Sequence, residues 1–89
     1  MKLRAYSIYD VKALNYHAPF FAHTDGSALR SFADLANDAN TTIGRHPTDY
    51  SLWCVGEFDD YTGFVTHFAP LVHVADAASL VLINNKPQE

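Results

Sequence analysis

Five histidines have side chains whose chemistry would suit a metal ion: His17, His23, His46, His67 and His73. Zinc sites need three or four ligands that converge on one ion, and many zinc hydrolases place two histidines four residues apart on a helix. No two histidines of this chain have that spacing. We therefore expect them to be scattered over strand ends and the surface, with no metal ion and no other cofactor.

Three carboxylates gather shortly before a glycine: Glu57, Asp59 and Asp60. Such a group could bind a divalent ion or exchange protons with a substrate. Aspartate is also common in tight turns, where its side chain accepts hydrogen bonds from nearby backbone N–H groups. We favour a solvated turn. The alternative is a metal-dependent hydrolase in which at least three histidine and aspartate side chains converge.

Cys54 is the single cysteine, which excludes a disulfide within the chain and a cysteine-rich zinc site. It lies between Trp53 and Val55 in an apolar run, where a buried thiol is unreactive. The glycine motifs of nucleoside-triphosphate and dinucleotide sites are absent. We therefore expect no catalytic residue, and we do not expect an enzyme.

The aromatic residues suggest a different chemistry, the stacking of nucleic-acid bases. The chain has five Tyr, six Phe and one Trp. A protein surface that exposes aromatic rings beside cations stacks single-stranded bases at about 1–3 kcal/mol per base. Arg4, Tyr6 and Lys12 would form the centre of such a surface if they shared one face of a sheet. The candidate nucleic-acid-binding residues are Lys2, Arg4, Tyr6, Lys12, Arg30 and Arg45.

Charge and size favour an alternative in which the aromatic residues fill the core or a dimer interface. The formal net charge is −4, from ten acidic and six basic residues. Nucleic-acid binders usually carry an excess of Lys and Arg, because these residues contact phosphates. A chain of 89 residues also has a small core, which a second copy can extend. The acidic balance counts against general DNA binding but leaves room for a local basic patch.

Two strands are predicted to precede a helix. Residues 3–9 alternate as a strand, with Arg4 and Tyr6 on the same side. Residues 16–22 form a second strand that Pro19 interrupts. A proline in a strand belongs at an edge or a bulge, so this strand is not central.

The helix is predicted to begin at Thr24 and Asp25, either of which can accept hydrogen bonds from the N–H groups of the first turn. Apolar residues then recur at helical spacing and would dock on a sheet. The helix ends at Asn37, and residues 41–49 form a polar loop.

Residues 50–58 form the strongest predicted strand, which is apolar on both faces and therefore central in the sheet. An acidic hairpin turn follows. Residues 64–68 return antiparallel until Pro70 ends the strand. Asp76 could then cap a short helix over residues 77–82.

These elements predict an α+β fold in the order β-β-α-β-β, a small antiparallel sheet with one helix packed on one face and room for a short C-terminal helix. We expect a single domain over residues 1–83 and a flexible tail over residues 84–89. No secretory signal and no apolar run of membrane-spanning length is present. We therefore expect no membrane contact and a cytoplasmic location.

Four short segments stand out for their order and spacing: Pro19-Phe20-Phe21, Ala28-Leu29-Arg30-Ser31-Phe32, His46-Pro47-Thr48-Asp49-Tyr50, and Gly56-Glu57-Phe58-Asp59 with Thr62-Gly63 following. Together they resemble the small non-structural protein of gokushovirus-type microviruses, which are phages with single-stranded circular DNA. The resemblance covers about residues 1–75. It implies a protein of the host cytoplasm that binds DNA during genome replication or packaging, and it implies no catalytic residue.

Two functions follow as expectations. The first is a phage accessory protein that binds single-stranded DNA through the six candidate residues. The second is a homodimeric interaction module that acts on a host or phage replication protein without binding nucleic acid. A contiguous cationic and aromatic surface would favour the first, and an apolar interface of about 1,000 Å² or more would favour the second.

Overall fold

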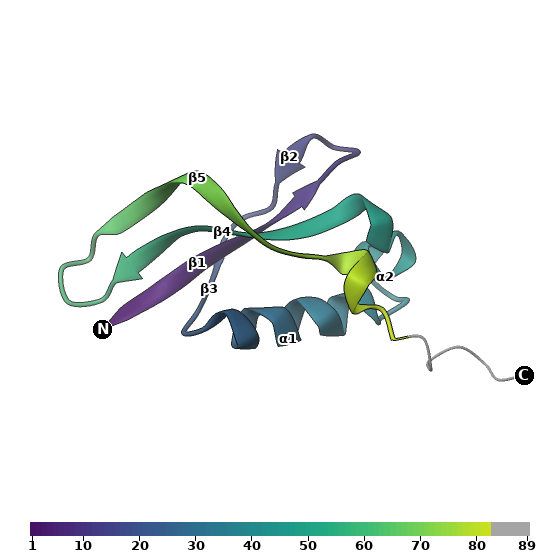
Figure 1. Ribbon diagram of the computed structural model, residues 1–89, viewed down its shortest axis with the longest axis horizontal. Coiled ribbons are helices and arrows are strands. Elements are labelled where there is room, and N and C mark those ends of the chain that lie inside the picture. The colour runs from purple at the N-terminus through teal and green to yellow at the C-terminus, as the bar shows by residue number, and fades with distance from the viewer. Residues whose placement is uncertain (83–89) are drawn as a thin grey trace, which may run out of the picture.

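Nine elements make up residues 1–82, the part of the chain that the computed structural model describes. The predicted tail over residues 84–89 and the last residue of the predicted domain lie outside it. None of the helices in this part is long and apolar enough to cross a membrane. In chain order (Figure 1) the elements are β1 (Lys2–Asp10), β2 (Asn15–Tyr16), β3 (Phe20–Ala22), α1 (Asp25–Ala36), α2 (Thr42–Arg45), the 3-10 helix η1 (Pro47–Asp49), β4 (Tyr50–Asp59), β5 (Val65–Asp76) and the 3-10 helix η2 (Ala77–Leu80).

The strands form one antiparallel sheet in the order β2-β1-β4-β5, with β3 also paired to β1. β1 and β4 pair along their lengths, from Lys2 opposite Asp59 to Asp10 opposite Tyr50. β4 lies between β1 and β5, which confirms that the apolar strand is central. The predicted α+β fold, with an antiparallel sheet and one main helix, is also confirmed.

α1 covers one face of this sheet (Figure 1). Thr24 caps the helix as predicted, because its Oγ1 accepts a hydrogen bond from the Ser27 N–H at 3.1 Å. The buried residues of the helix recur at helical spacing and are Ala28, Phe32 and Ala36. The strand residues that join them in the core include Tyr6, Ile8, Leu52 and Cys54.

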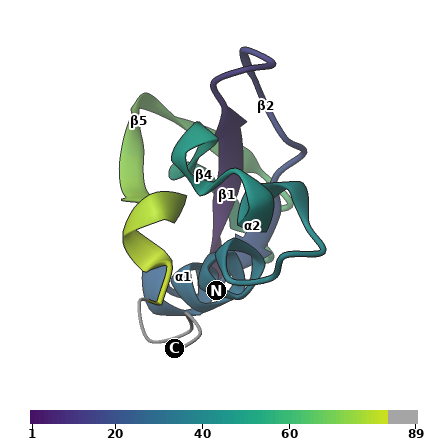
Figure 2. The same cartoon turned by 90° about the vertical axis from the view of Figure 1, so that its right-hand side faces the viewer.

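Residues 41–49 contain two short helices, so the prediction of a polar loop is wrong. Thr41 Oγ1 accepts a hydrogen bond from the Gly44 N–H at 2.9 Å, and Ile43 is buried. Figure 2 shows α2 and η2 beside α1 at one end of the molecule. A helix of one turn is too short to give the apolar periodicity by which helices are recognised in a sequence.

β5 continues through Pro70 to Asp76, so the prediction that Pro70 ends the strand is wrong. β5 lies at the edge of the sheet, where the missing N–H of a proline can face away from the ladder. The register with β4 shifts between Cys54 and Gly56, and Pro70 lies in the stretch of β5 opposite this shift. This irregular pairing accommodates the proline, and β5 continues beyond it.

Two further predictions concern the ends of elements. The predicted strand over residues 16–22 is divided into β2 and β3, and the interruption at Pro19 is confirmed. The C-terminal helix is shorter than predicted, because η2 ends at Leu80. Asp76 does not cap it with its side chain. Instead, Asp76 Oδ1 forms a hydrogen bond with His73 Nε2 at 2.8 Å.

Candidate functional site

The two faces of the sheet carry different residues of β1. Side chains alternate along β1, so Arg4 and Tyr6 point toward α1, whereas Ala5 and Ser7 point to the opposite side. The alternation predicted for this strand is confirmed. We call the side packed by α1 the covered face and the opposite side the uncovered face.

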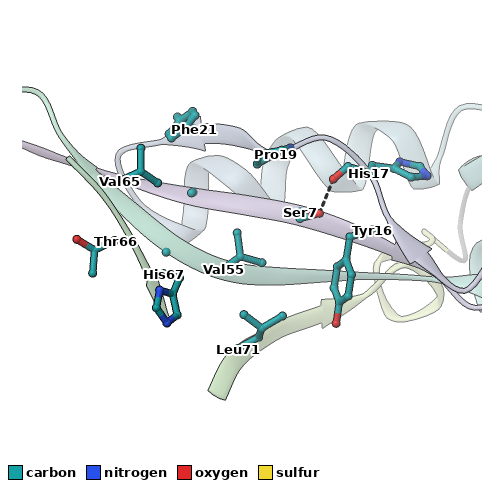
Figure 3. A pocket seen from close by; sticks show the side chains of 12 residues that line it. Ser7, Tyr16, His17, Pro19, Phe21, Val55, Val65, Thr66, His67 and Leu71 are labelled. Atoms are coloured by element: carbon teal, nitrogen blue, oxygen red, sulfur yellow. Dashed lines mark hydrogen bonds between the residues drawn. The ribbon is translucent and has the colours of Figure 1, made fainter. Parts of the chain in front are cut away.

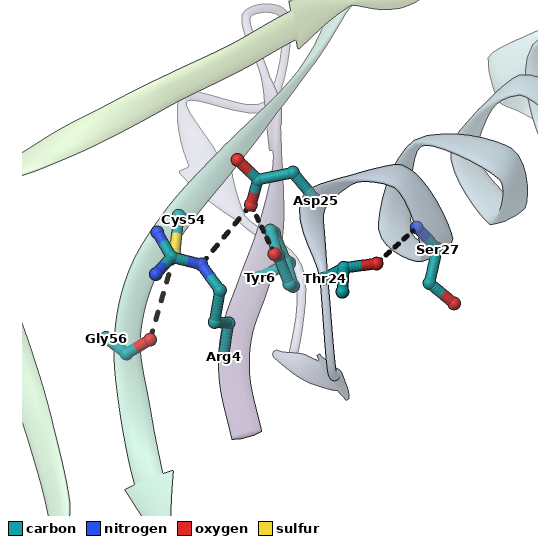
Figure 4. Close-up of polar contacts among 7 residues, drawn as sticks. All are labelled: Arg4, Tyr6, Thr24, Asp25, Ser27, Cys54 and Gly56. Atoms are coloured by element: carbon teal, nitrogen blue, oxygen red, sulfur yellow. Dashed lines mark hydrogen bonds and ion pairs between the residues drawn. The ribbon is translucent and has the colours of Figure 1, made fainter. Parts of the chain in front are cut away.

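At one end of the covered face, Arg4, Tyr6 and Asp25 form a polar cluster (Figure 4). Tyr6 Oη donates a hydrogen bond to Asp25 Oδ1 at 2.5 Å, and Arg4 Nε lies 3.3 Å from the same oxygen. Arg4 Nε makes no hydrogen bond of good geometry within residues 1–82, so its contact with Asp25 is electrostatic. Burial, followed by the contact with Asp25, raises the pKa of Tyr6 to about 12. The cluster fastens the first turn of α1 to β1.

Tyr6, a candidate base-stacking residue, is buried in this structure. Its side chain is 0% exposed, and its ring stacks on that of Phe20 with centroids 5.8 Å apart. A nucleic-acid base cannot reach it in this structure. Arg4 is also engaged, because it pairs with Asp25 and its guanidinium lies 5.7 Å from the centre of the Phe68 ring.

The other four candidates lie apart from one another. Lys2 pairs with Glu57 at 3.4 Å, and the Arg45 guanidinium donates to a backbone carbonyl six residues earlier at 3.2 Å. Lys12 lies in the turn after β1 and Arg30 on α1; both are exposed and neither forms an ion pair within residues 1–82. The structure does not bring the six candidates together into one cationic and aromatic surface.

The uncovered face is hollowed by a groove of about 410 Å³ (Figure 3), to which all five strands contribute. On β4, Cys54 pairs with Tyr6 and Gly56 pairs with Ala5, so Val55 is the extra residue of a β-bulge. The bulge turns Val55 toward the groove. The walls also include Tyr16, Phe21, Val65, His67 and Leu71.

The groove has no charged wall. None of the twelve residues that line it is Asp, Glu, Lys or Arg. The Ser7 hydroxyl donates to the His17 carbonyl at 2.7 Å, so its one O–H donor is already used within the wall. The groove therefore suits an apolar partner and offers no cation to a phosphate.

The turn of the β4–β5 hairpin exposes two large aromatic side chains, Tyr61 at 91% and Phe64 at 71%. We call these two residues the hairpin tip. The predicted turn chemistry is confirmed, since Asp59 Oδ1 accepts a hydrogen bond from the Tyr61 N–H at 2.9 Å and this bond lowers the pKa of Asp59. Asp60 forms an ion pair with the Met1 amino group at 2.9 Å. Both carboxylates thus stabilise the turn.

The histidines lie on different parts of the sheet. His17 and His67 line the groove, whereas His73 contacts Trp53 and Asp76. Within residues 1–82, no group of three or more His, Cys, Asp or Glu side chains is placed to hold a metal ion. The metal-dependent hydrolase has no site in this part of the chain.

Of the groove residues, His17 and His67 were considered as metal ligands, but Val55 and Leu71 were not among the candidates. Val55 and Leu71 are ordinary apolar strand residues that no motif distinguishes, and Phe21 stood out only as part of the segment Pro19-Phe20-Phe21. The sequence contains a weaker signal for an apolar surface on the second face, because residues 50–58 are apolar at both odd and even positions. A strand with that pattern is covered on both faces, and a sheet packed by one helix leaves one of them open.

Comparisons with known proteins support a phage origin. No curated protein matches the chain, and no solved structure matches it. A family model described as Phage ORF5 protein matches residues 3–80, which is most of the chain. The predicted phage origin is confirmed at this level, while the microvirus type and DNA binding stay predictions. The chain belongs to the phage ORF5 protein family.

Proposed function

We propose that this phage protein is a homodimeric interaction module whose uncovered sheet face binds a second copy of the chain. The observation that carries the proposal is the apolar groove, which is open to solvent and lined by no Asp, Glu, Lys or Arg side chain. Contiguous apolar surface on the outside of a small protein marks a site of contact with another protein.

Charge supports a protein partner over a nucleic acid. The net charge is −4, and Lys2 and Arg4 are already paired with carboxylates of their own chain. Binding to a phosphate backbone depends on free Lys and Arg side chains. An apolar partner needs none of them.

The small core supports a second copy as that partner. The largest fully buried side chains in the described part are Tyr6, Phe32, Leu52 and Cys54. Small domains gain stability when two copies share an apolar interface. Packing the uncovered faces together would give the sheet a second apolar layer, as in a β-sandwich.

The test is the oligomeric state, measured by sedimentation equilibrium over a wide concentration range. Val55→Lys places an ammonium group in the groove and should yield a monomer, because a buried unpaired charge is costly. Leu14→Lys changes a side chain that is 74% exposed and outside the groove, so this matched control should remain a dimer. A wild-type chain that stays monomeric at high concentration would discard the proposal.

In this proposal the dimer acts in the host cytoplasm on a host or phage replication protein, a role that fits a non-structural phage protein. The dimer leaves α1 and the exposed Arg30 outside the shared interface. These surfaces remain available for a further partner.

Single-stranded DNA binding is a second candidate, favoured by the aromatic rings of the uncovered face. Tyr16 and Phe21 are 43% and 45% exposed, and such rings can stack on bases. The test is fluorescence polarisation of a labelled oligo-dT strand at low and moderate salt, with double-stranded DNA as control. Saturable binding that weakens with salt, prefers single strands and falls in Phe21→Ala supports this candidate. No binding at low salt and high protein concentration discards it.

A further inference from the structure

We infer that the hairpin tip of each copy inserts into the groove of its partner, so that two identical contacts hold the dimer. The inference rests on the proposed homodimer and specifies its contact. Tyr61 and Phe64 supply the inserted rings, and Val55, His67 and Leu71 belong to the receiving walls.

Nothing within residues 1–82 covers the hairpin tip. α1 has 12 residues, which span about 18 Å at 1.5 Å per residue. β4 has 10 residues, which span about 33 Å at 3.3 Å per residue. The hairpin therefore extends past the N-terminal end of α1, as Figure 1 shows. Two aromatic rings at the end of such a projection are typical anchors of a protein interface.

The backbone of the hairpin turn is already ordered by its own hydrogen bonds. The Asp59 N–H donates to the Phe64 carbonyl at 2.9 Å, and the Gly63 N–H donates to the Asp59 carbonyl at 2.7 Å. Thr62 Oγ1 accepts a further bond from the Phe64 N–H at 3.2 Å. Because the turn is preorganised, its backbone loses little conformational entropy when the two rings insert.

The groove matches the tip in size and in polarity. Its volume of about 410 Å³ lies within the range of pockets that hold drug-sized molecules, so it has room for two aromatic rings. Its walls carry no charged side chain to be desolvated. At the tip, the nearby Asp60 carboxylate is paired with the Met1 amino group, so little unpaired charge would enter the interface.

Both halves of the contact belong to one hairpin, which points to a second copy as the partner. Val65 and His67 line the groove on β5, and the hairpin tip directly precedes them in the chain. A two-fold axis beside the hairpin would bring each tip to the other groove and close the dimer. Four aromatic rings of about 150–250 Å² each, with the matching groove walls, would bury about 1,200–2,000 Å² in total. That area is what a stable interface needs.

The test is complementation between two variants. Tyr61→Ser/Phe64→Ser removes the rings but keeps the groove, and Val55→Lys blocks the groove but keeps the rings. Each contact needs one tip and one groove, so two copies of the same variant can form neither contact. Each variant alone should therefore be monomeric. A mixture can form a heterodimer with one intact contact, from the tip of Val55→Lys into the groove of the double variant. Sedimentation with one variant labelled should show heterodimer affinity at least tenfold above either self-association.

The outcomes separate the inference from the proposed homodimer. If Val55→Lys is monomeric but the double variant dimerises like the wild type, the homodimer stands and the tip contact is overturned. If both variants are monomeric and do not complement, the reciprocal contact is also overturned. A monomeric wild type overturns both statements. Leu71→Lys provides a second groove variant, and circular dichroism confirms that each variant is folded.

Discussion

The covered and uncovered faces are built from the same strands but have different surroundings. On the covered face, Tyr6 and Leu52 are fully buried in the core that α1 completes with Phe32. On the uncovered face, Tyr16 and Phe21 remain 43% and 45% exposed. Residue type does not explain the difference, because both faces are apolar. The two faces differ because α1 packs on only one of them.

The two faces use their side chains in different ways. Polar groups on the covered face, such as Tyr6 and Asp25, bond to each other and serve the fold. Within residues 1–82 the rings of Tyr16 and Phe21 contact neighbouring rings of the sheet, those of Tyr9 and Phe58, but no helix covers the apolar groups of the uncovered face. An apolar surface without an internal partner indicates an external one.

The largest expected difference between the faces is in core substitutions. Leu52→Ala should lower the free energy of unfolding by about 2–5 kcal/mol, because it leaves a cavity beneath α1. Tyr61→Ala, at the exposed hairpin tip, should change the stability of the monomer by less than about 0.5 kcal/mol. Urea unfolding at low protein concentration measures both. Equal losses of stability in the two variants would contradict the distinction between the buried core and the exposed hairpin tip.

Tyr6→Phe tests the polar cluster of the covered face. Loss of the hydrogen bond to Asp25 should lower stability by about 1.5–3 kcal/mol at neutral pH. The pKa of Tyr6 is raised to about 12 in the folded chain, against about 10 in an unfolded one. The unfolded chain therefore loses this proton first, and the stabilisation present below pH 10 is lost as the pH rises toward 12.

Urea unfolding of wild type and Tyr6→Phe at several pH values tests whether the stabilisation by Tyr6 is lost as the pH rises. The stability gap between them should be constant below pH 10 and should shrink by about 2–3 kcal/mol between pH 10 and 12. The other tyrosines are present in both proteins, so their titration cancels in the difference between the two free energies of unfolding. A gap that is independent of pH would show that Tyr6 is not held neutral by its surroundings.

Gly56→Ala tests the bulge that shapes the groove. A Cβ at this position would lie 2.3 Å from the Thr66 carbonyl oxygen, so the backbone of β5 must move. We expect a loss of about 1–3 kcal/mol and weaker dimerisation. The matched control is Gly26→Ala in the first turn of α1, where the nearest atom is 3.9 Å away; it should gain about 0.4–1 kcal/mol. A neutral Gly56→Ala would contradict the tight pairing of β4 and β5.

The smallest expected effect compares two threonines that accept backbone hydrogen bonds. Thr24→Ala removes the cap of α1 and should lower stability by about 1 kcal/mol. Thr62→Ala removes a similar bond in the exposed hairpin turn, and we expect a change within about 0.5 kcal/mol. Thermal unfolding compares them directly. If Thr62→Ala costs more, the hairpin contributes to monomer stability and is more than a binding projection.

Local signals in the sequence predicted most of the fold. The cap at Thr24, the alternation along β1 and the aspartate-rich turn before Gly63 each depend on residues close together in the chain, so a sequence reader can recognise them. The central position of β4 also followed, because its apolar residues occupy both faces. The short helix α2 and the passage of β5 through Pro70 did not, because they depend on burial of Ile43 and on an edge position in the sheet.

The candidate site could be predicted only in part. The sequence determined that aromatic residues and a few cations lie near the strands, and that a dimer interface was one use for them. Only the tertiary structure decided which face of the sheet α1 covers. α1 packs on the side of Arg4 and Tyr6 and buries the tyrosine, while the bulge at Val55 helps to shape the groove on the other side. Which face of the sheet is covered depends on contacts between segments that are far apart in the chain. No local sequence pattern encodes such contacts.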